Sequence, residues 1–312
     1  MSETVDLTTQ LGTVLLPSPI IAASGTFGHG AEVAHLCDPT HLGAVTSKSQ
    51  APFLWAGNRA PRLIPVAAGM VNAVGLQGRG IEHWIERDLP ELKATGARVI
   101  ASIWGFTVED FAQAARLLVA VQDQLVGVEI NLSCPNHGSG ATVFSHDTAL
   151  SAEVVQAVHA TNLQVPLFAK LSAGVTDLPE VAGAVVGAGA TGLTLINTFR
   201  SLVIDAETRR PALGAAGGGL SGPALKVIAL RAVHDVAQAH PHIPIIGTGG
   251  VLTGLDAVEM LLAGASAVGV GTATFYEPRA THRITDELVD WCRTHGVGSV
   301  RDLIGGLKEP EK

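Results

Sequence analysis

Residues 243–250 read Ile-Pro-Ile-Ile-Gly-Thr-Gly-Gly, and residues 267–272 read Ala-Val-Gly-Val-Gly-Thr. Each is a short apolar run that ends in glycine, and a stretch with helical spacing of apolar residues, 254–263, lies between them. A strand, a helix and a second strand in this order form the unit of parallel sheets with right-handed crossovers. This segment therefore predicts a parallel sheet covered by helices.

The same alternation extends over the rest of the chain. Eight apolar runs predict strands at 19–23, 44–47, 98–103, 127–131, 167–171, 192–197, 243–247 and 267–271. Helical spacing fills the intervals between the last six, at 108–124, 151–161, 178–188, 221–240 and 254–263. Eight such units predict one (β/α)8 TIM barrel domain over residues 1–312, with its active site at the C-terminal ends of the strands. The alternative is an open doubly wound sheet, but its glycine fingerprint is absent after the first strand, where the chain reads Ala23-Ser24-Gly25-Thr26-Phe27-Gly28.

Composition excludes several functional classes. The net charge is -8, and no cluster of lysine and arginine is present, which argues against nucleic-acid binding. The cysteines, Cys37, Cys134 and Cys292, lack metal-site spacing, which argues against a zinc site or an iron–sulfur cluster in this chain and indicates a reducing compartment. The N-terminus lacks an apolar signal core, and no uninterrupted apolar stretch could span a bilayer. We expect a cytoplasmic protein that binds no membrane and no metal.

In a TIM barrel, the residues that end the strands meet at one opening. Here they are small, amide-bearing or cationic: Ser24, Lys48, Ser102, Asn131, Lys170, Asn197, Gly249, Gly250, Gly271 and Thr272. Such a set suits a polar, planar, anionic ligand. The glycines after the last two strands expose backbone N–H groups, as a phosphate site requires, and Gly219-Leu220-Ser221-Gly222 could add another donor. Tight strand-to-helix turns are the alternative explanation of these glycines.

Lysines and asparagines extend this prediction. Lys170 ends an apolar strand, where a lysine needs a partner, and Lys48 is placed likewise. An ion pair would explain either lysine, but a cation beside the pyrimidine ring of a flavin would also stabilise the charge of the reduced flavin. Asn72, Asn131 and Asn197 can bind both the C=O and the N–H groups of an imide-like ring.

One cysteine follows a predicted strand directly, in the run Asn131-Leu132-Ser133-Cys134-Pro135-Asn136. A thiol between two asparagines could accept a proton from a ligand that the amides hold. A buried structural thiol beside a proline turn is the alternative, and Asn136 could simply cap that turn.

Five motifs together resemble the dihydroorotate dehydrogenases, most closely the NAD-linked two-protein type, class 1B. The motifs are Ala23 to Gly28, Asn72-Ala73-Val74-Gly75-Leu76-Gln77, Asn131 to Asn136, Ile196-Asn197-Thr198 and Gly219 to Gly222. The resemblance runs from the first predicted strand to the last. It implies an FMN-containing oxidoreductase that converts (S)-dihydroorotate to orotate in de novo pyrimidine biosynthesis.

The resemblance also implies roles for individual residues. Cys134 matches the catalytic base, which removes the C5 proton while C6 gives hydride to N5 of FMN. Matches to FMN contacts are Ser24, Lys48, Ser49, Ser102, Asn131, Lys170, Ile196, Gly222, Gly249, Gly250, Gly271 and Thr272. Matches to substrate contacts are Lys48, Asn72, Ala73, Val74, Gly75, Leu76, Asn131, Asn197 and Thr198. A positioned base suits this chemistry because the C5 proton is only weakly acidic.

The chain departs from the family at two places. Ser102 stands where the family usually has asparagine. Lys170-Leu171-Ser172-Ala173-Gly174 stands where the family usually has Lys-Leu-Ser-Pro-Asn, a change that keeps the lysine.

The resembled class passes its electrons to NAD⁺ through a second protein that carries FAD and a [2Fe–2S] cluster. Three scattered cysteines fit this division of labour between two proteins, because this chain cannot bind a cluster itself. The resemblance further implies a homodimer or a heterotetramer. No amphipathic N-terminal extension is present, which argues against the membrane-bound, quinone-reducing relatives. Three alternatives remain: an enzyme acting on another dihydropyrimidine such as dihydrouracil, a non-redox barrel enzyme that binds a phosphorylated metabolite, and a non-catalytic flavin-binding paralogue.

Overall fold

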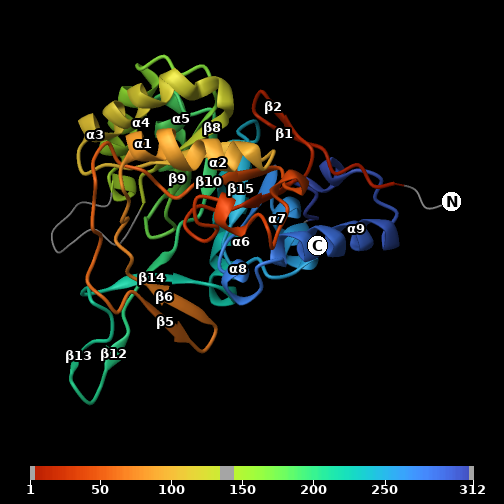
Figure 1. Ribbon diagram of the computed structural model, residues 1–312. Coiled ribbons are helices and arrows are strands. Elements are labelled where there is room, and N and C mark those ends of the chain that lie inside the picture. The colour runs from red at the N-terminus through yellow and green to blue at the C-terminus, as the bar shows by residue number, and fades with distance from the viewer. Residues whose placement is uncertain (1–3, 134–143, 309–312) are drawn as a thin grey trace.

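The computed structural model describes residues 4–133 and 144–308, and its centre is a closed parallel barrel (Figure 1). The strand order around the barrel is β10-β15-β16-β3-β4-β7-β8-β9. The barrel strands are β3 (Ile20–Ala22), β4 (Ala44–Thr46), β7 (Val99–Ile103), β8 (Leu125–Asn131), β9 (Leu167–Leu171), β10 (Gly192–Leu195), β15 (Ile245–Thr248) and β16 (Ala267–Val270). All eight predicted strands are confirmed, with ends that differ by two residues or fewer. The fold is therefore the predicted (β/α)8 TIM barrel.

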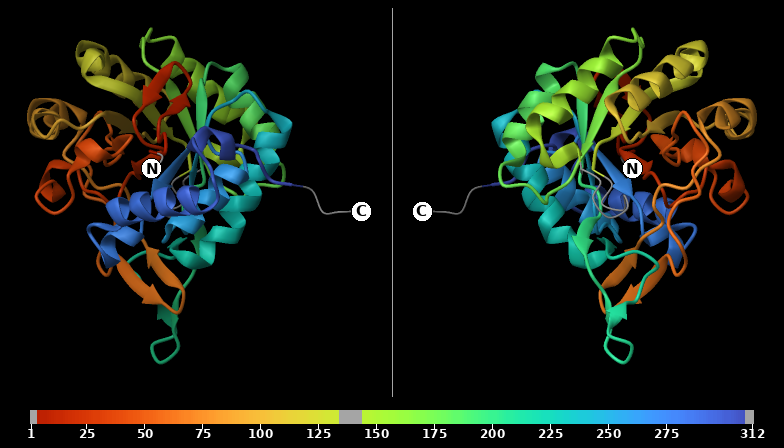
Figure 2. Two further views of the ribbon diagram at one scale, coloured as in Figure 1. Left: turned by 90° about the vertical axis from the view of Figure 1, so that its right-hand side faces the viewer. Right: turned by 90° about the vertical axis from the view of Figure 1, so that its left-hand side faces the viewer.

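Helices cover the outside of the barrel (Figures 1 and 2). The principal ones are α3 (Val108–Leu118), α4 (Thr148–His159), α5 (Leu178–Gly187), α6 (Lys226–Ala239), α7 (Gly254–Leu262) and α9 (Ala280–Thr294). The shorter segments are α1 (Ile81–His83), a π-helical turn (Trp84–Asp88), α2 (Leu89–Ala94) and α8 (Ala273–Tyr276). No helix in residues 4–133 and 144–308 is long and apolar enough to cross a membrane.

Helix starts follow local capping signals. Thr107 and Asp110 form a capping box at α3, and Thr253 and Asp256 form another at α7. The predicted helix at 221–240 begins later than expected, at Lys226. Ser221 instead ends a strand that pairs with Met70, and this pairing extends the chain up to the 3-10 turn that Pro223 begins.

Apolar side chains fill the barrel at its N-terminal end. The hairpin of β1 (Thr9–Leu11) and β2 (Val14–Leu16) closes that end, and Leu11 and Leu16 pack there with Ile21, Phe168 and Ile246. A larger apolar cluster lies between the barrel strands and the helices. Because apolar residues occupy this end, the polar residues inside the barrel gather toward the opposite, C-terminal end.

A second sheet, which the sequence did not predict, lies at one end of the barrel (Figures 1 and 2). Its antiparallel strands are β11 (Phe199–Ser201), β14 (Gly218–Ser221), β6 (Gly69–Asn72) and β5 (Leu63–Val66), in that order. A hairpin of β12 (Ile204–Asp205) and β13 (Arg210–Pro211) projects beyond it. The sheet carries Asn72, which pairs with Gly219, to the same pocket that the barrel strands reach.

Candidate active site

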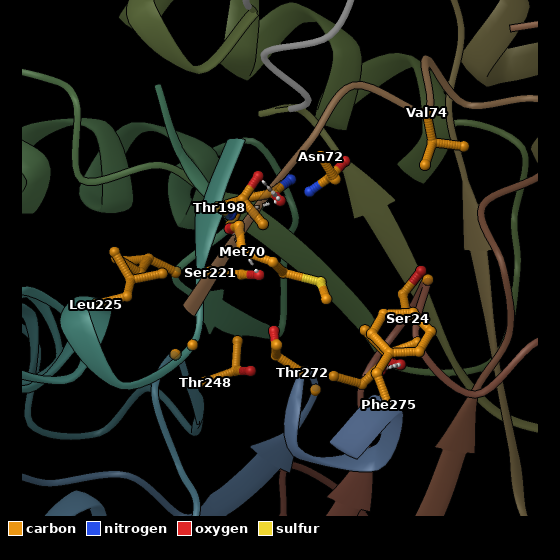
Figure 3. A pocket seen from close by; sticks show the side chains of 18 of the residues that line it. Ser24, Met70, Asn72, Val74, Thr198, Ser221, Leu225, Thr248, Thr272 and Phe275 are labelled. Atoms are coloured by element: carbon orange, nitrogen blue, oxygen red, sulfur yellow. Dashed lines mark hydrogen bonds between the residues drawn. The ribbon is translucent and has the colours of Figure 1, made fainter. Parts of the chain in front are cut away.

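One pocket lies at the C-terminal ends of the barrel strands, beside the second sheet (Figure 3). In Figure 3, Thr248 and Thr272 from the barrel share this pocket with Met70 and Ser221 from the sheet. Seventeen of the predicted contact residues line it: Ser24, Lys48, Ser49, Asn72, Val74, Gly75, Leu76, Asn131, Lys170, Ile196, Asn197, Thr198, Gly222, Gly249, Gly250, Gly271 and Thr272. The structure therefore brings together residues from loops separated by most of the chain.

Two predicted site residues that the structure describes, Ala73 and Ser102, do not take part in this lining. Ala73 is fully buried between Asn72 and Val74, and packs in a small apolar cluster of the second sheet. Ser102 is also fully buried, and its hydroxyl contacts Glu129 and Ser49 rather than the pocket, because serine is shorter than the asparagine usual in the family. Cys134 lies outside the described residues.

Backbone N–H groups edge one side of the pocket. Within the described part of the chain, no hydrogen bond uses the N–H groups of Gly250, Val251, Gly271 or Thr272. Gly250 has a φ of +77°, and a Cβ added to it would lie 2.5 Å from the backbone nitrogen of Lys226. The turn therefore requires glycine, and it leaves donors available to an anionic ligand.

Asp256 holds this glycine turn in place. Its carboxylate accepts hydrogen bonds from the backbone N–H groups of Leu252 (2.9 Å) and Thr253 (2.8 Å), and it pairs with Nζ of Lys226 at 2.7 Å. Glu259 contacts the same ammonium at 2.7 Å. Burial alone would raise the pKa of the Asp256 carboxyl, but the hydrogen bonds from Lys226, Leu252 and Thr253 outweigh burial and hold that pKa below its usual range. Hydrogen bonds to Asp256 and Glu259 raise the pKa of Lys226.

We expect Asp256→Asn to lower the free energy of unfolding by about 2 kcal/mol at pH 7, the range for hydrogen bonds to a charged group. Because the pKa of the folded carboxylate is depressed, its contribution is complete above the unfolded pKa of about 3.9 and is lost as pH falls through the folded pKa. Urea denaturation at several pH values would show the two proteins converging in acid. Asp235→Asn, which removes an exposed pair with Arg231, should change stability by less than about 0.5 kcal/mol. A constant difference down to pH 3 would contradict this assignment.

A lysine in the wall of the pocket is paired with a buried carboxylate behind it. Nζ of Lys170 lies 3.3 Å from Oε1 of Glu129, and their side chains are only 7% and 3% exposed. Glu129 was not predicted, although strand alternation places it on the same face of β8 as Asn131. The predicted need of Lys170 for a partner is thus met by an ion pair.

Two asparagines are fixed by contacts with each other. Nδ2 of Asn197 donates to Oδ1 of Asn131 at 3.1 Å and to Oγ of Ser133 at 3.1 Å. Nδ2 of Asn131 donates to Oγ of Ser49 at 3.0 Å. A third amide, that of Asn72, donates to the carbonyl of Gly219 at 3.2 Å. These side chains present amide groups to the pocket from β8, from the segment after β10 and from the second sheet.

The pocket also contains lining residues that the motifs did not indicate. They are largely apolar: Leu63, Met70, Leu225, Val251, Leu252 and Phe275. Leu63 and Met70 belong to the second sheet, so no local pattern could have placed them. The pocket therefore offers an apolar wall as well as polar groups, as expected for a site that binds an aromatic ring system.

The cysteines that the structure describes lie away from the pocket. Cys37 and Cys292 are fully buried and are not among the lining residues. Burial raises the pKa of both thiols. Each is therefore a structural thiol rather than a base.

The departure at Gly174 leaves the lysine of the strand undisturbed. Lys170 remains in β9 and lines the pocket. The N–H of Gly174 donates to Oγ of Ser172 at 3.2 Å, which closes a short turn after the strand.

Comparison with known proteins agrees with the motifs. The sequence model of the family described as dihydroorotate dehydrogenase matches residues 6–291. A Geobacter sp. (strain M21) protein named dihydroorotate dehydrogenase B (NAD(+)), catalytic subunit, is 43% identical over 97% of this chain and 98% of its own length. A Solibacter usitatus protein, provisionally named dihydroorotate dehydrogenase A (fumarate), is 44% identical over 98% of this chain and 99% of its own.

A solved structure gives the same fold. The dihydroorotate dehydrogenase of Eimeria tenella, crystallised with ferulenol, superposes with a TM-score of 0.79 over 96% of this chain and 88% of its own, at 24% identity. The family match and the relatives, which share more than two-fifths of their residues with this chain, carry the assignment. The chain therefore belongs to the dihydroorotate dehydrogenase family of oxidoreductases, with NAD-linked class 1B catalytic subunits among its relatives at 42–43% identity.

Proposed function

We propose that this chain is an FMN-containing catalytic subunit that oxidises (S)-dihydroorotate to orotate, a step of de novo pyrimidine biosynthesis. The observation that carries the proposal is a single pocket lined by nearly all the residues that match FMN and substrate contacts in the family. Family membership supports the same reaction.

The residues present fit FMN. The N–H groups of Gly250, Val251, Gly271 and Thr272, which have no acceptor among the described residues, suit a phosphate. The apolar side chains suit a ring system, and Lys170 supplies a positive charge at the wall. Ser24, Ser49, Asn131, Ile196 and Gly222 would complete the contacts. When bound, FMN would supply the acceptor for the hydride of the substrate.

The polar groups of the pocket also suit dihydroorotate. The substrate is an imide-like ring with a carboxylate, so it needs hydrogen-bond donors, acceptors and one positive charge. Asn72, Asn131 and Asn197 supply amides, and Lys48 supplies the charge. The chain from Ala73 to Leu76, together with Thr198, would close around the ring. A charge at Lys48 favours dihydroorotate over dihydrouracil, which has no carboxylate.

We assign Cys134 as the base that removes the C5 proton. The last described residue before it, Ser133, is fixed in the wall: its Oγ donates to the carbonyl of Lys170 at 2.9 Å and accepts from Asn197. Ser133, the residue that precedes Cys134 in the sequence, is thus held beside the amides of Asn131 and Asn197. The other two cysteines are buried elsewhere, which leaves Cys134 as the thiol for this role.

We further propose that a partner subunit carrying FAD and a [2Fe–2S] cluster passes the electrons to NAD⁺ in a cytoplasmic heterotetramer built on a homodimer of this chain. The name of the Geobacter relative, a catalytic subunit, supports such a partner. Fumarate is the second candidate acceptor, and the provisional name of the Solibacter relative favours it.

An anaerobic absorbance scan tests the reaction. We expect the purified chain to be yellow, to lose its flavin absorbance on addition of dihydroorotate, and to remain unchanged with dihydrouracil. A colourless protein that gains no absorbance from added FMN would refute the proposal. Re-oxidation by fumarate without a partner would identify fumarate as the acceptor, whereas re-oxidation by NAD⁺ only in the presence of the partner subunit would identify NAD⁺.

Substitution of the phosphate-side glycine should weaken FMN binding. We expect Gly250→Ala to raise the dissociation constant of FMN at least tenfold, because the added Cβ forces the turn to move away from Lys226. Gly296→Ala is the matched control: its φ is +69°, so alanine is strained there too by about 1–3 kcal/mol, but nothing lies within 4 Å of the added Cβ. FMN fluorescence titration measures both. Equal weakening in the two variants would show that the effect is only a loss of stability.

A further inference from the structure

Glu129 is a buried carboxylate that does not itself line the pocket. It is 2% exposed, and a single oxygen, Oε1, contacts both Nζ of Lys170 at 3.3 Å and Oγ of Ser102 at 3.0 Å. Taking a carboxylate out of water costs several kcal/mol unless charge and hydrogen bonds compensate it. Lys170 and Ser102 supply that compensation, and they connect Glu129 to the pocket by two separate routes.

The first route is a chain of hydroxyl groups whose direction Glu129 determines. An ionised carboxylate only accepts hydrogen bonds, so Ser102 must donate to it. Because Ser102 has no other hydroxyl hydrogen, it must accept from Ser49, whose Oγ lies 2.9 Å away. Ser49 then has no hydrogen left for Ser24, whose Oγ lies at 3.4 Å, so Ser24 is the donor of that pair. All three hydroxyl groups therefore point toward the carboxylate.

The asparagines of the pocket are oriented by the same chain. With its own hydrogen directed to Ser102, Ser49 can only accept from Nδ2 of Asn131. The carbonyl oxygen of Asn131 is thereby turned toward Nδ2 of Asn197, and both hydrogens of that Nδ2 are used, on Asn131 and on Ser133. Oδ1 of Asn197 already accepts a hydrogen bond from the N–H of Thr198 at 2.7 Å. This oxygen is therefore the group of the Asn197 amide that can still accept a hydrogen bond.

The second route is the ion pair. Lys170 lines the pocket, whereas Glu129 lies behind it, so the pair carries no net charge as long as both groups are ionised. Removal of the carboxylate charge leaves a net charge of +1 if the lysine stays protonated. A positive charge beside the flavin favours the anionic reduced form over the neutral oxidised form.

We propose that Glu129 is a positioning residue of the active site, which moderates the charge of Lys170 and, through Ser102 and Ser49, orients the hydrogen bonds of Ser24, Asn131 and Asn197. This inference rests on the proposed function. Ser102, which replaces the usual asparagine, thus serves the carboxylate rather than the ligand. In this role Glu129 affects two measurable quantities, the reduction potential of the bound flavin and the affinity of the protein for orotate.

Three variants of the full chain reconstituted with FMN separate these properties. Glu129→Gln keeps the side-chain shape but removes the charge and allows the amide to donate. Ser102→Ala breaks the hydroxyl chain and keeps the ion pair. Thr194→Val is the matched control: Thr194 is 2% exposed, pairs with Lys170 in the neighbouring strand, and its hydroxyl has no partner among the described residues.

We expect Glu129→Gln to raise the preference for reduced over oxidised FMN at least tenfold, which is a shift of about 30 mV toward positive potential for two electrons. Ser102→Ala should leave the potential unchanged and weaken orotate binding by about three- to tenfold, the contribution of one hydrogen bond. Thr194→Val should match the wild type in both measurements. Dye-coupled redox titration and orotate titration of the flavin spectrum give the two values.

The following results would overturn the inference. If the wild type holds FMN but Glu129→Gln keeps its potential, or if Thr194→Val shifts potential and affinity as much as the other variants, Glu129 has no positioning role. If Glu129→Gln does not fold, an orotate affinity of Ser102→Ala equal to that of the wild type is sufficient to reject the positioning role of Glu129. A wild-type chain that binds no FMN refutes the proposed function itself, and this inference with it.

Discussion

Replacing Cys134 with alanine is expected to lower the rate of flavin reduction by dihydroorotate by about 100- to 10,000-fold, the usual contribution of a positioned base. The C5 proton is weakly acidic, and neither asparagine nor serine in the run 131–136 can accept it at neutral pH. Orotate should still bind to the variant, because binding depends on the lysine and the amides. Anaerobic stopped-flow absorbance measures the rate, and orotate titration of the flavin spectrum measures the binding.

The pH dependence gives this prediction a second readout. A thiol with an ordinary pKa of about 8.5 is mostly protonated at neutral pH, so the wild-type rate should rise with pH until the thiol is ionised. The alanine variant should lose this rise. Cys292→Ala, which alters a buried thiol away from the pocket, is the control and should keep both the rate and the pH profile. A Cys134→Ala protein with wild-type rate and profile would show that another group takes the proton.

The barrel could be predicted from sequence because each of its strands is buried on both faces. Such strands read as continuous apolar runs, as at 167–171, and glycine, proline or a polar residue marks their ends. Three of the five predicted helices, at 108, 178 and 254, begin where the structure has them, and the capping box of Thr253 and Asp256 shows that local contacts fix one of these starts. The end of β10 is harder to predict: the sequence places it at the polar residue Asn197, whereas the strand stops at Leu195.

The second sheet could not be predicted from local patterns. Its strands are three or four residues long and only partly buried, and β6 pairs with β14 from a distant part of the chain. Nδ2 of Asn72, for example, contacts the carbonyl of Gly219, 147 residues away. No periodic signal records such pairing, so the prediction that Asn72 belongs to the site depended on family resemblance. The apolar wall from Leu63 and Met70 was missed for the same reason.

Glu129 and Ser102 show a different limit. Both lie on inward-facing positions that strand alternation defines, since Ser102 pairs with Glu129 across β7 and β8. The predicted site consisted of the residues that end each strand. It therefore included Ser102 but not Glu129, which lies two residues before the end of β8 at Asn131. The length of a side chain decides whether a residue at such a depth reaches the ligand, and only the structure supplies that depth.

Lys170→Met is expected to lower the free energy of unfolding by about 3–5 kcal/mol, the cost of leaving a buried charge without its partner. Glu129 is 2% exposed, so water cannot replace the ammonium. Urea denaturation of the FMN-free chain measures this loss without any contribution from the cofactor. Arg231→Met, which breaks an exposed pair with Asp235, should cost less than about 1 kcal/mol. A similarly small loss in Lys170→Met would contradict the buried ion pair.

Combining Lys170→Met with Glu129→Gln separates stability from function. The double variant has no buried charge at this place, so most of the lost stability should return, because a neutral pair of similar volume replaces the ion pair. Lys170→Met should also lower FMN affinity, because it removes the cation that faces the pocket, and this affinity should stay low in the double variant. Equilibrium unfolding and FMN titration of the single and double variants form one mutant cycle. Stability that returns while FMN affinity does not would mean that the ion pair is retained for the flavin rather than for the fold.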